Sequence, residues 1–239
     1  MTAARTCCGP TTTNGRPTLP TVEVFSGGNP DLEPESSNSL TVGAIFQPAF
    51  LPGFDMTVDY WDIDIENVIT SYSVTNMENK CVDLPSLDNS FCPNVTRDPV
   101  THKITRINTF SINASRMKAR GVDFGMNYSR PVGEGNLLAS FKGTWNIENI
   151  IDSTPGIDTG ILHYDGDFTT PRFRGNLYTA YSVGDVTLAM NNQFISAAVV
   201  SRNWASPEYL GDKNRVGAKV YTNLSLRHDF DDRYTLGFG

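Results

Sequence analysis

Three acidic residues, Asp62, Asp64 and Glu66, alternate along one predicted strand and so share one of its faces. Two carboxylates side by side can act as general acid and general base in glycoside hydrolysis. That chemistry needs a pocket that perturbs the pKa of one carboxyl, and the surrounding sequence supplies none. We therefore expect a solvated stripe at one end of the strand, and no catalytic residue.

A second acidic group, Asp158, Asp165 and Asp167, lies among glycines and could offer oxygen ligands to calcium. The spacing is not that of an EF-hand loop, so an ordinary surface loop is the prediction. The three histidines fall in different segments, without the spacing of a zinc site. The sequence also has no glycine-rich phosphate loop, nucleophile elbow or cysteine–histidine pair. Neither a metal, a cofactor nor an enzymatic activity is predicted.

Side chains alternate strictly between apolar and polar from residue 121 to residue 129. One parity carries Val122, Phe124, Met126 and Tyr128. The same split recurs in residues 54–61, 139–146, 172–181 and 186–191. Charges fall on the other parity, as expected of strands that face lipid, where a Lys or Arg near the midplane costs ~2–4 kcal/mol. Two basic residues, at positions 118 and 120, share the apolar parity, and we place them beyond the hydrocarbon.

The connections between these strands alternate between short and long. Residues 49–53, 130–135, 184–185 and 231–233 form tight joints, whereas residues 67–103, 150–170 and 200–216 form long ones. A soluble β-sandwich would also show alternating side chains, because one face of each sheet is buried. Outer-membrane barrels add short turns at one rim and long loops at the other. The connections therefore favour a membrane barrel over a soluble all-β domain.

Composition agrees with this prediction and excludes other classes. No apolar run approaches the ~20 residues that a transmembrane helix needs, and the mean hydropathy is -0.28. Barrel strands are compatible with such values because only alternate residues meet lipid. The formal net charge is -7 and the pI about 4.9. These values argue against a nucleic-acid partner, which would require a basic surface.

Several motifs resemble those of TonB-dependent outer-membrane receptors. An N-P-x-L-x-P-E motif occupies residues 29–35, and an L-P-G turn at 51–53 precedes a V-D-Y-W-x-I-x-I strand at 58–65. Residues 120–124 are similar to the family's recurring R-G-V-D-F strand start, and residues 220–239 to its late strands. The resemblance covers residues 25–239.

The resemblance implies an all-β fold, an antiparallel transmembrane β-barrel segment of about eight strands from a barrel of about 22. It assigns 25–239 to a partial barrel and leaves 1–24 as an unassigned loop segment. The family's plug domain, TonB-engaging motif and last strands are not found in the sequence, so we expect a fragment that is not competent alone.

The resemblance also implies a function. Receptors of this family sit in the bacterial outer membrane and take up a scarce, bulky solute, namely a siderophore, cobalamin, haem or oligosaccharide. The expected partners are outer-membrane lipid, the solute, and the TonB complex through the missing plug, with no nucleic acid. Possible ligand contacts are Arg172, Arg174, Tyr178, Arg227, Trp204, Tyr209, His163 and Tyr164. Pairing of the arginines with lumen or plug carboxylates is an equal alternative for them.

Two other functions stay open, a small passive or structural outer-membrane barrel and a soluble β-rich carbohydrate-binding or hydrolytic domain. Cys81 and Cys92 lie in the longest predicted loop, where family members often carry a similar F-C-x-x-x-x-R-D pattern. The resemblance implies a disulfide between them, with two free thiols as the alternative. The adjacent Cys7 and Cys8 have no assigned role.

Overall fold

The computed structural model describes residues 11–13, 16–18, 22–154, 160–203, 211–230 and 233–239. The chain divides into two compact units. The small unit comprises residues 1–35 and 67–115, and the sheet unit comprises residues 36–66 and 116–239. None of the helices in the described ranges has the length and apolar character needed to cross a bilayer.

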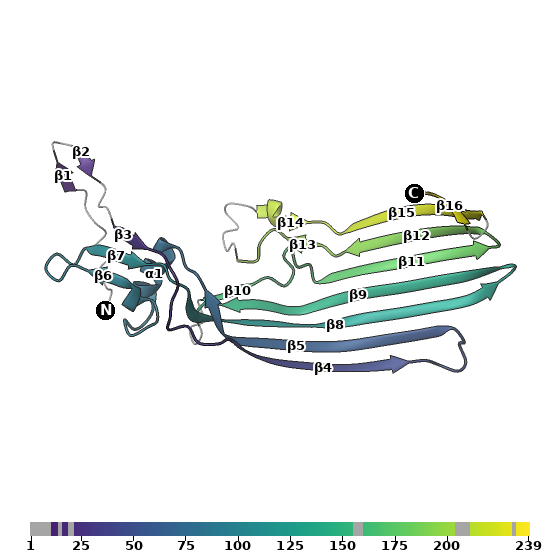
Figure 1. The fold of residues 1–239 in the computed structure, drawn as a ribbon, viewed down its shortest axis with the longest axis horizontal. Coiled ribbons are helices and arrows are strands. Elements are labelled where there is room, and N and C mark those ends of the chain that lie inside the picture. The colour runs from purple at the N-terminus through teal and green to yellow at the C-terminus, as the bar shows by residue number, and fades with distance from the viewer. Residues whose placement is uncertain (1–10, 14–15, 19–21, 155–159, 204–210, 231–232) are drawn as a thin grey trace. The chain divides into compact units, whose positions relative to one another are not determined.

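The sheet unit is built on one nine-stranded sheet (Figure 1). Eight strands follow the order β16-β15-β12-β11-β9-β8-β5-β4, and a short ninth strand, β10, pairs with β9. Their bounds are β4 (Ser36–Phe46), β5 (Phe54–Thr70), β8 (Ile112–Val132), β9 (Gly135–Asp152), β10 (Ile161–His163), β11 (Phe173–Val183), β12 (Val186–Ile195), β15 (Lys219–Phe230) and β16 (Tyr234–Phe238). Every pairing described within it is antiparallel. The predicted fold class is confirmed. Within the described residues the sheet stays open, with β4 and β16 at its edges.

The strands are joined alternately by short and long connections, as predicted. Two residues, Gly133 and Glu134, separate β8 from β9, and Gly184 and Asp185 separate β11 from β12. At the opposite ends of the strands, about 20 or more residues separate β9 from β11 and β12 from β15. We call these two ends of the sheet the short-turn end and the long-loop end. Two further short strands, β13 (Ala198–Val199) and β14 (Arg215–Val216), pair in the connection after β12, beside the 3-10 helix η3 (Gly211–Asn214).

Strand register brings the apolar side chains of neighbouring strands onto one face. Val122 lies opposite Trp145, which lies opposite Phe173 on the next strand. The apolar face comprises Met56, Val58, Val122, Phe124, Met126, Phe141, Trp145, Phe173, Leu177, Leu188, Met190, Phe194, Leu224 and Leu226. Many of these side chains are exposed: Trp145 at 50% and Leu224 at 58%. An exposed apolar surface that crosses so many strands marks an interface with a protein or a membrane.

Two polar side chains on the apolar face, Thr222 and Asn192, are paired with each other. Thr222 lies opposite Asn192, and the Thr222 hydroxyl donates to the Asn192 side-chain oxygen at 2.7 Å. Pairing removes part of the cost of placing a hydroxyl and an amide in an apolar environment. The opposite face, here called the polar face, comprises Thr57, Asp59, Asp123, Asn127, Ser140, Lys142, Arg174, Asn176, Tyr178, Asn191, Gln193 and Arg227.

Two ion pairs on the apolar parity of β8 lie toward the long-loop end. The β8–β9 register shifts between Arg120 and Gly121, and Arg120 pairs there with Glu148 at 3.0 Å. Further along, the Arg116 guanidinium is bound to the Asp64 carboxylate. β8 has 21 residues, about twice the ~9–11 that a membrane-spanning strand needs. The strand is therefore long enough to carry these ion pairs beyond a hydrocarbon layer.

The turn between β4 and β5 depends on Gly53. Its φ is +84°, and a Cβ at this position would lie 2.0 Å from the Ser129 carbonyl oxygen, a backbone atom. We expect Gly53→Ala to destabilise the sheet by at least ~2 kcal/mol, since a positive φ alone costs ~1–2 kcal/mol. Gly184 is the matched control, because its φ is +52° but its surroundings are open. Urea unfolding of both variants tests this, and equal losses would contradict it.

The small unit is a mixed α/β element, whereas the sequence predicted only a long loop for most of it. It holds β3 (Glu23–Phe25), the helix α1 (Val74–Asp83), the 3-10 helix η1 (Cys92–Asn94), β6 (Val95–Arg97) and β7 (Ile104–Asn108). β7 pairs in parallel with β3 and antiparallel with β6. The predicted long loop of residues 67–103 therefore contains a helix, α1. Separately, β1 (Thr11–Thr13) pairs antiparallel with β2 (Arg16–Thr18).

A disulfide holds the core of the small unit. It joins Cys81 on α1 to Cys92 on η1, with 4.6 Å between the Cα atoms. The buried side chains around it are Tyr72, Met77, Phe91, Ile107 and Ile112. The rings of Tyr72 and Phe91 meet edge to face at 5.0 Å. α1 begins at the N-cap Ser73, whose hydroxyl accepts a hydrogen bond from the backbone N–H of Asn76 at 3.3 Å.

Asp98 organises the turn between β6 and β7. Its carboxylate accepts the backbone N–H groups of Thr101 and Val100 and the Thr101 hydroxyl, which lowers the pKa of Asp98. A lowered folded-state pKa means that the turn is stabilised above the ordinary Asp pKa and loses this stabilisation as the pH falls through the folded value. Carbon-13 NMR titration of the Asp98 carboxyl should give a midpoint below that of an unstructured peptide, and Thr101→Val should bring it closer. An unshifted midpoint would contradict this assignment.

Candidate ligand-binding site

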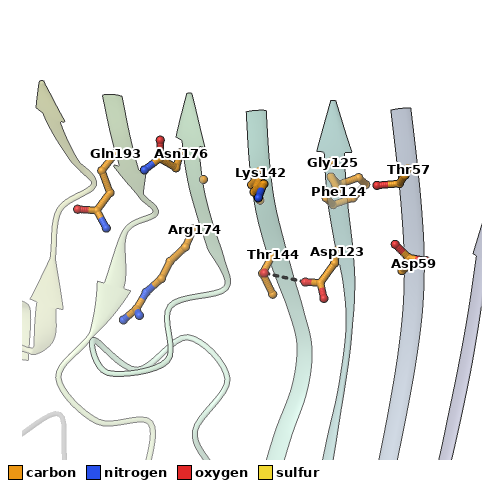
Figure 2. Close-up of a pocket in the computed structure, with 12 residues that line it drawn as sticks. Thr57, Asp59, Asp123, Phe124, Gly125, Lys142, Thr144, Arg174, Asn176 and Gln193 are labelled. Carbon is orange, nitrogen blue, oxygen red and sulfur yellow. Dashed lines mark hydrogen bonds between the residues drawn. The ribbon is translucent and has the colours of Figure 1, made fainter. Parts of the chain in front are cut away.

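A hollow of 480 Å³ lies on the polar face of the sheet (Figure 2). Five neighbouring strands contribute to it: β5, β8, β9, β11 and β12. It is lined by Thr57, Asp59, Asp123, Phe124, Gly125, Lys142, Gly143, Thr144, Arg174, Gly175, Asn176 and Gln193. The strand alternation that exposes one apolar face therefore gathers charged and amide side chains on the other.

Charge is distributed unevenly across the hollow. Asp59 and Asp123 come from β5 and β8, and Lys142 and Arg174 from β9 and β11. The Thr144 hydroxyl donates to the Asp123 carboxylate at 2.7 Å (Figure 2). No described ion pair joins the two cations to the two carboxylates, so the hollow offers both signs of charge to an occupant.

Gly125 keeps space open in the hollow. A Cβ on Gly125 would lie 2.5 Å from the Thr57 hydroxyl. The small residue therefore lets Thr57 on the neighbouring strand approach the β8 backbone.

Two segments at the long-loop end are joined by a buried carboxylate. Residues 161–172 and 196–203, which we call the clasp, meet at Asp165. The Asp165 side chain accepts from Arg172 at 3.1 Å and from Arg202. Asp167 accepts the Arg202 backbone N–H at 2.8 Å. A surface loop was predicted around Asp158, Asp165 and Asp167, but two of these carboxylates are buried, since Asp165 is 4% and Asp167 5% exposed. Both buried carboxylates accept hydrogen bonds from Arg202, a residue that is distant in sequence. Asp158 lies outside the described residues.

Four predicted ligand contacts lie near this end of the sheet. Arg174 lines the hollow, and its guanidinium also donates to the Thr169 carbonyl at 2.9 Å. Arg172 and His163 belong to the clasp, with His163 Nδ1 3.7 Å from Asp165. The Tyr164 carbonyl accepts the Asp167 amide there. The structure therefore groups these four residues at the long-loop end of the sheet.

The other predicted contacts are not part of this group. Tyr178 lies on the polar face opposite Ser140, and the hollow does not include it. Arg227 lies nearer the short-turn end, opposite Thr187, and pairs with Asp229 at 3.0 Å. Trp204 and Tyr209 lie outside the described residues.

Sequence reasoning missed several residues of this region. Asp59, Lys142, Asn176 and Gln193 were assigned to the polar parity or left unassigned, and none was named as a contact. Parity alone could have grouped the first three with Arg174. Arg202 carried no signal, since its connection to Asp165 spans 37 positions. Across the described ranges, no three His, Cys, Asp or Glu side chains gather as a metal site would require.

Comparison with known proteins agrees with the fold. A ferric enterobactin receptor from Pseudomonas aeruginosa (PfeA), solved with enterobactin, has a TM-score of 0.58 at 15% identity, covering 90% of this chain and 26% of that one. The siderophore receptor PirA from Acinetobacter baumannii has a TM-score of 0.50 at 14% identity, with 87% and 27% covered. The chain thus spans about a quarter of the length of these structures.

These likenesses show the fold, while the sequence itself shows the family. No curated protein matches the chain. Residues 10–239 match the family described as TonB dependent receptor-like, beta-barrel. The chain therefore belongs to the TonB-dependent receptors, through their β-barrel.

Proposed function

We propose that the chain forms part of a receptor in the bacterial outer membrane that takes up a scarce, bulky solute with energy from the TonB complex. The observation that carries this proposal is the two-faced sheet. One face presents exposed apolar side chains across neighbouring strands, and the other holds a polar hollow. A barrel wall between lipid and a polar lumen requires this combination.

The proposed solute is a ferric siderophore, with haem, cobalamin and an oligosaccharide as the other candidates. Two structures of similar fold are a receptor solved with enterobactin and a siderophore receptor, which supports this class. Lys142 and Arg174 in the hollow suit an anionic chelate, because cations pair strongly with oxygen anions in partly dehydrated sites. Asn176 and Gln193 add amide donors and acceptors.

Uptake by cells tests the proposal directly. Deleting the native gene should abolish uptake of one solute from a panel of ferric siderophores, haem, cobalamin and oligosaccharides. Loss of TonB should abolish the same uptake, and a plasmid copy of the gene should restore it. Unchanged uptake of every member of the panel would refute the proposed function.

A further inference from the structure

The clasp is fixed by hydrogen bonds between its two segments. The Phe168 amide donates to the Val199 carbonyl at 2.8 Å, and the Val199 amide donates to the Gly166 carbonyl at 2.9 Å. The Asn203 side chain binds the backbone N–H and carbonyl of His163, as the backbone of a neighbouring strand would. Its oxygen accepts the His163 amide at 2.7 Å, and its nitrogen donates to the His163 carbonyl at 2.8 Å. Two separate connections of the sheet are thus held in one geometry.

Asp165 lies at the centre of the clasp. Its side chain is 5% exposed, and a single carboxylate oxygen, Oδ2, accepts from both Arg172 and Arg202. Arg202 Nη1 also donates to the Asp165 backbone carbonyl at 3.0 Å. His163 Nδ1 lies 3.7 Å from the other oxygen, Oδ1. The one buried carboxylate therefore orients two guanidinium groups toward the same point.

The charges in this cluster do not cancel. Among the described residues, the guanidinium groups of Arg172, Arg174 and Arg202 contact the clasp against the two buried carboxylates of Asp165 and Asp167, so one positive charge is in excess even when His163 is neutral. Arg172 remains 55% exposed and Arg202 35% exposed. A guanidinium has five N–H donors, and Asp165 occupies only part of this capacity. The exposed donors are therefore placed to receive a further anionic group.

The clasp adjoins the hollow through β11. The backbone N–H of Asn146 donates to the Arg172 backbone carbonyl at 2.8 Å, which continues the β9–β11 ladder by one residue. Arg172 and Arg174 are two residues apart, so they share the polar face. Arg174 lines the hollow and also donates to Thr169 within the clasp. The clasp thus adjoins the part of the hollow that holds Lys142 and Arg174.

We propose that Asp165 is the positioning residue of an anion-binding site in which Arg172 and Arg202 receive an anionic group of the ligand. The inference rests on the proposed function and adds two points, the negative charge of the ligand and the residue that aligns the arginines. For removal of the Asp165 charge, the inference and simple electrostatics predict opposite effects on anion affinity. Removing a negative charge beside two arginines would strengthen anion binding if Asp165 only screened them, and weakens it if Asp165 aligns them.

The test uses the purified product of the native gene and two probes of similar size, an anionic ferric tris-catecholate and an uncharged ferric tris-hydroxamate. Wild type should bind the anionic chelate more tightly. Asp165→Asn should weaken its binding by about tenfold, the loss expected when one charge-assisted hydrogen bond is misaligned. Binding of the uncharged chelate should change by less than about twofold. A purely structural role would weaken both.

Matched variants keep the result interpretable. Arg172→Gln should reproduce the loss for the anionic chelate, and Arg172→Lys should restore part of it. Asp55→Asn removes the same charge from the polar face, outside the hollow and without touching either clasp arginine, and should leave anion binding unchanged. Amide hydrogen exchange at Gly166, Phe168 and Val199 reports whether the clasp of Asp165→Asn is still closed.

Three outcomes would overturn the inference: Asp165→Asn binding the anionic chelate as well as wild type, equal losses for both chelates, or wild type binding neither chelate. The uptake assay separates these outcomes from failure of the proposed function. If one of these outcomes occurs and cells still take up a solute of the panel, only the proposed anion site is refuted. The proposed receptor function is then unaffected.

Discussion

Replacing Cys81 and Cys92 by alanine should destabilise the small unit by about 3 kcal/mol, the entropy expected from closing a loop of this length. The bond links residues 11 positions apart and joins α1 to η1. Few buried side chains accompany it, namely Tyr72, Met77, Phe91, Ile107 and Ile112. A core of this size rarely holds a small unit folded without a cross-link. The loss should therefore unfold the small unit before the sheet unit.

Limited proteolysis with mass spectrometry measures this effect. Cleavage should appear within residues 74–97 of the variant while residues 116–152 stay protected. Reduction of the wild-type disulfide should give the same pattern, and Cys81→Ala alone should match the double variant because either change removes the bond. Equal resistance of the oxidised, reduced and variant proteins would show that the disulfide adds no stability.

Met126→Lys should cost ~2–4 kcal/mol of folding free energy in a bilayer, because Met126 lies on the apolar face near the middle of the alternating stretch 121–129 of β8. Its neighbours on that face are Phe124, Tyr128 and, across the strand pair, Phe141. A Lys side chain there would have to leave its charge in hydrocarbon or reach far to an interface. Urea unfolding from lipid vesicles, followed by fluorescence, gives the free energy.

Asn127→Lys is the control for this prediction. Asn127 is the next residue of the same strand and points to the polar face, where it donates to Asp55 at 2.9 Å and accepts from Ser140 at 2.8 Å. The same charge placed there should cost less than half as much, since water or polar groups solvate it. Comparable losses at positions 126 and 127 would mean that neither face is in contact with lipid.

The sheet could be predicted from sequence because its signals are local and repeated. The alternation of Val122, Phe124 and Met126 with polar residues determines their faces regardless of what the strands pack against. The short joints favour pairing of consecutive strands, since antiparallel neighbours follow one another along the chain. Gly184 and Asp185, for example, provide a two-residue hairpin turn.

The small unit and the clasp could not be predicted in the same way. α1 has a readable start at Ser73 and a buried pair at Met77 and Cys81, but ten residues carry too few turns for a firm helical period. Asp165 meets Arg202 across 37 positions. Such pairs depend on how two loops fold over one another, which neither residue type nor spacing reveals. Arg174 was found because strand parity places it, and Arg202 was missed because no strand does.

The most direct test of a barrel wall compares two tryptophans on opposite faces of the sheet. Trp145 lies on the apolar face, and Trp61 lies on the polar parity. The two residues lie at the same height along the strands, because a Cβ on Gly121 would contact both the Trp61 ring and the Trp145 carbonyl oxygen. Versions of the native gene product that keep one tryptophan at a time are reconstituted in vesicles of brominated lipid. Quenching of Trp145 with little quenching of Trp61 is the predicted result. Equal quenching of the two, or stronger quenching of Trp61, would contradict the assignment of the apolar face to lipid and with it the proposed place of the chain in the outer membrane.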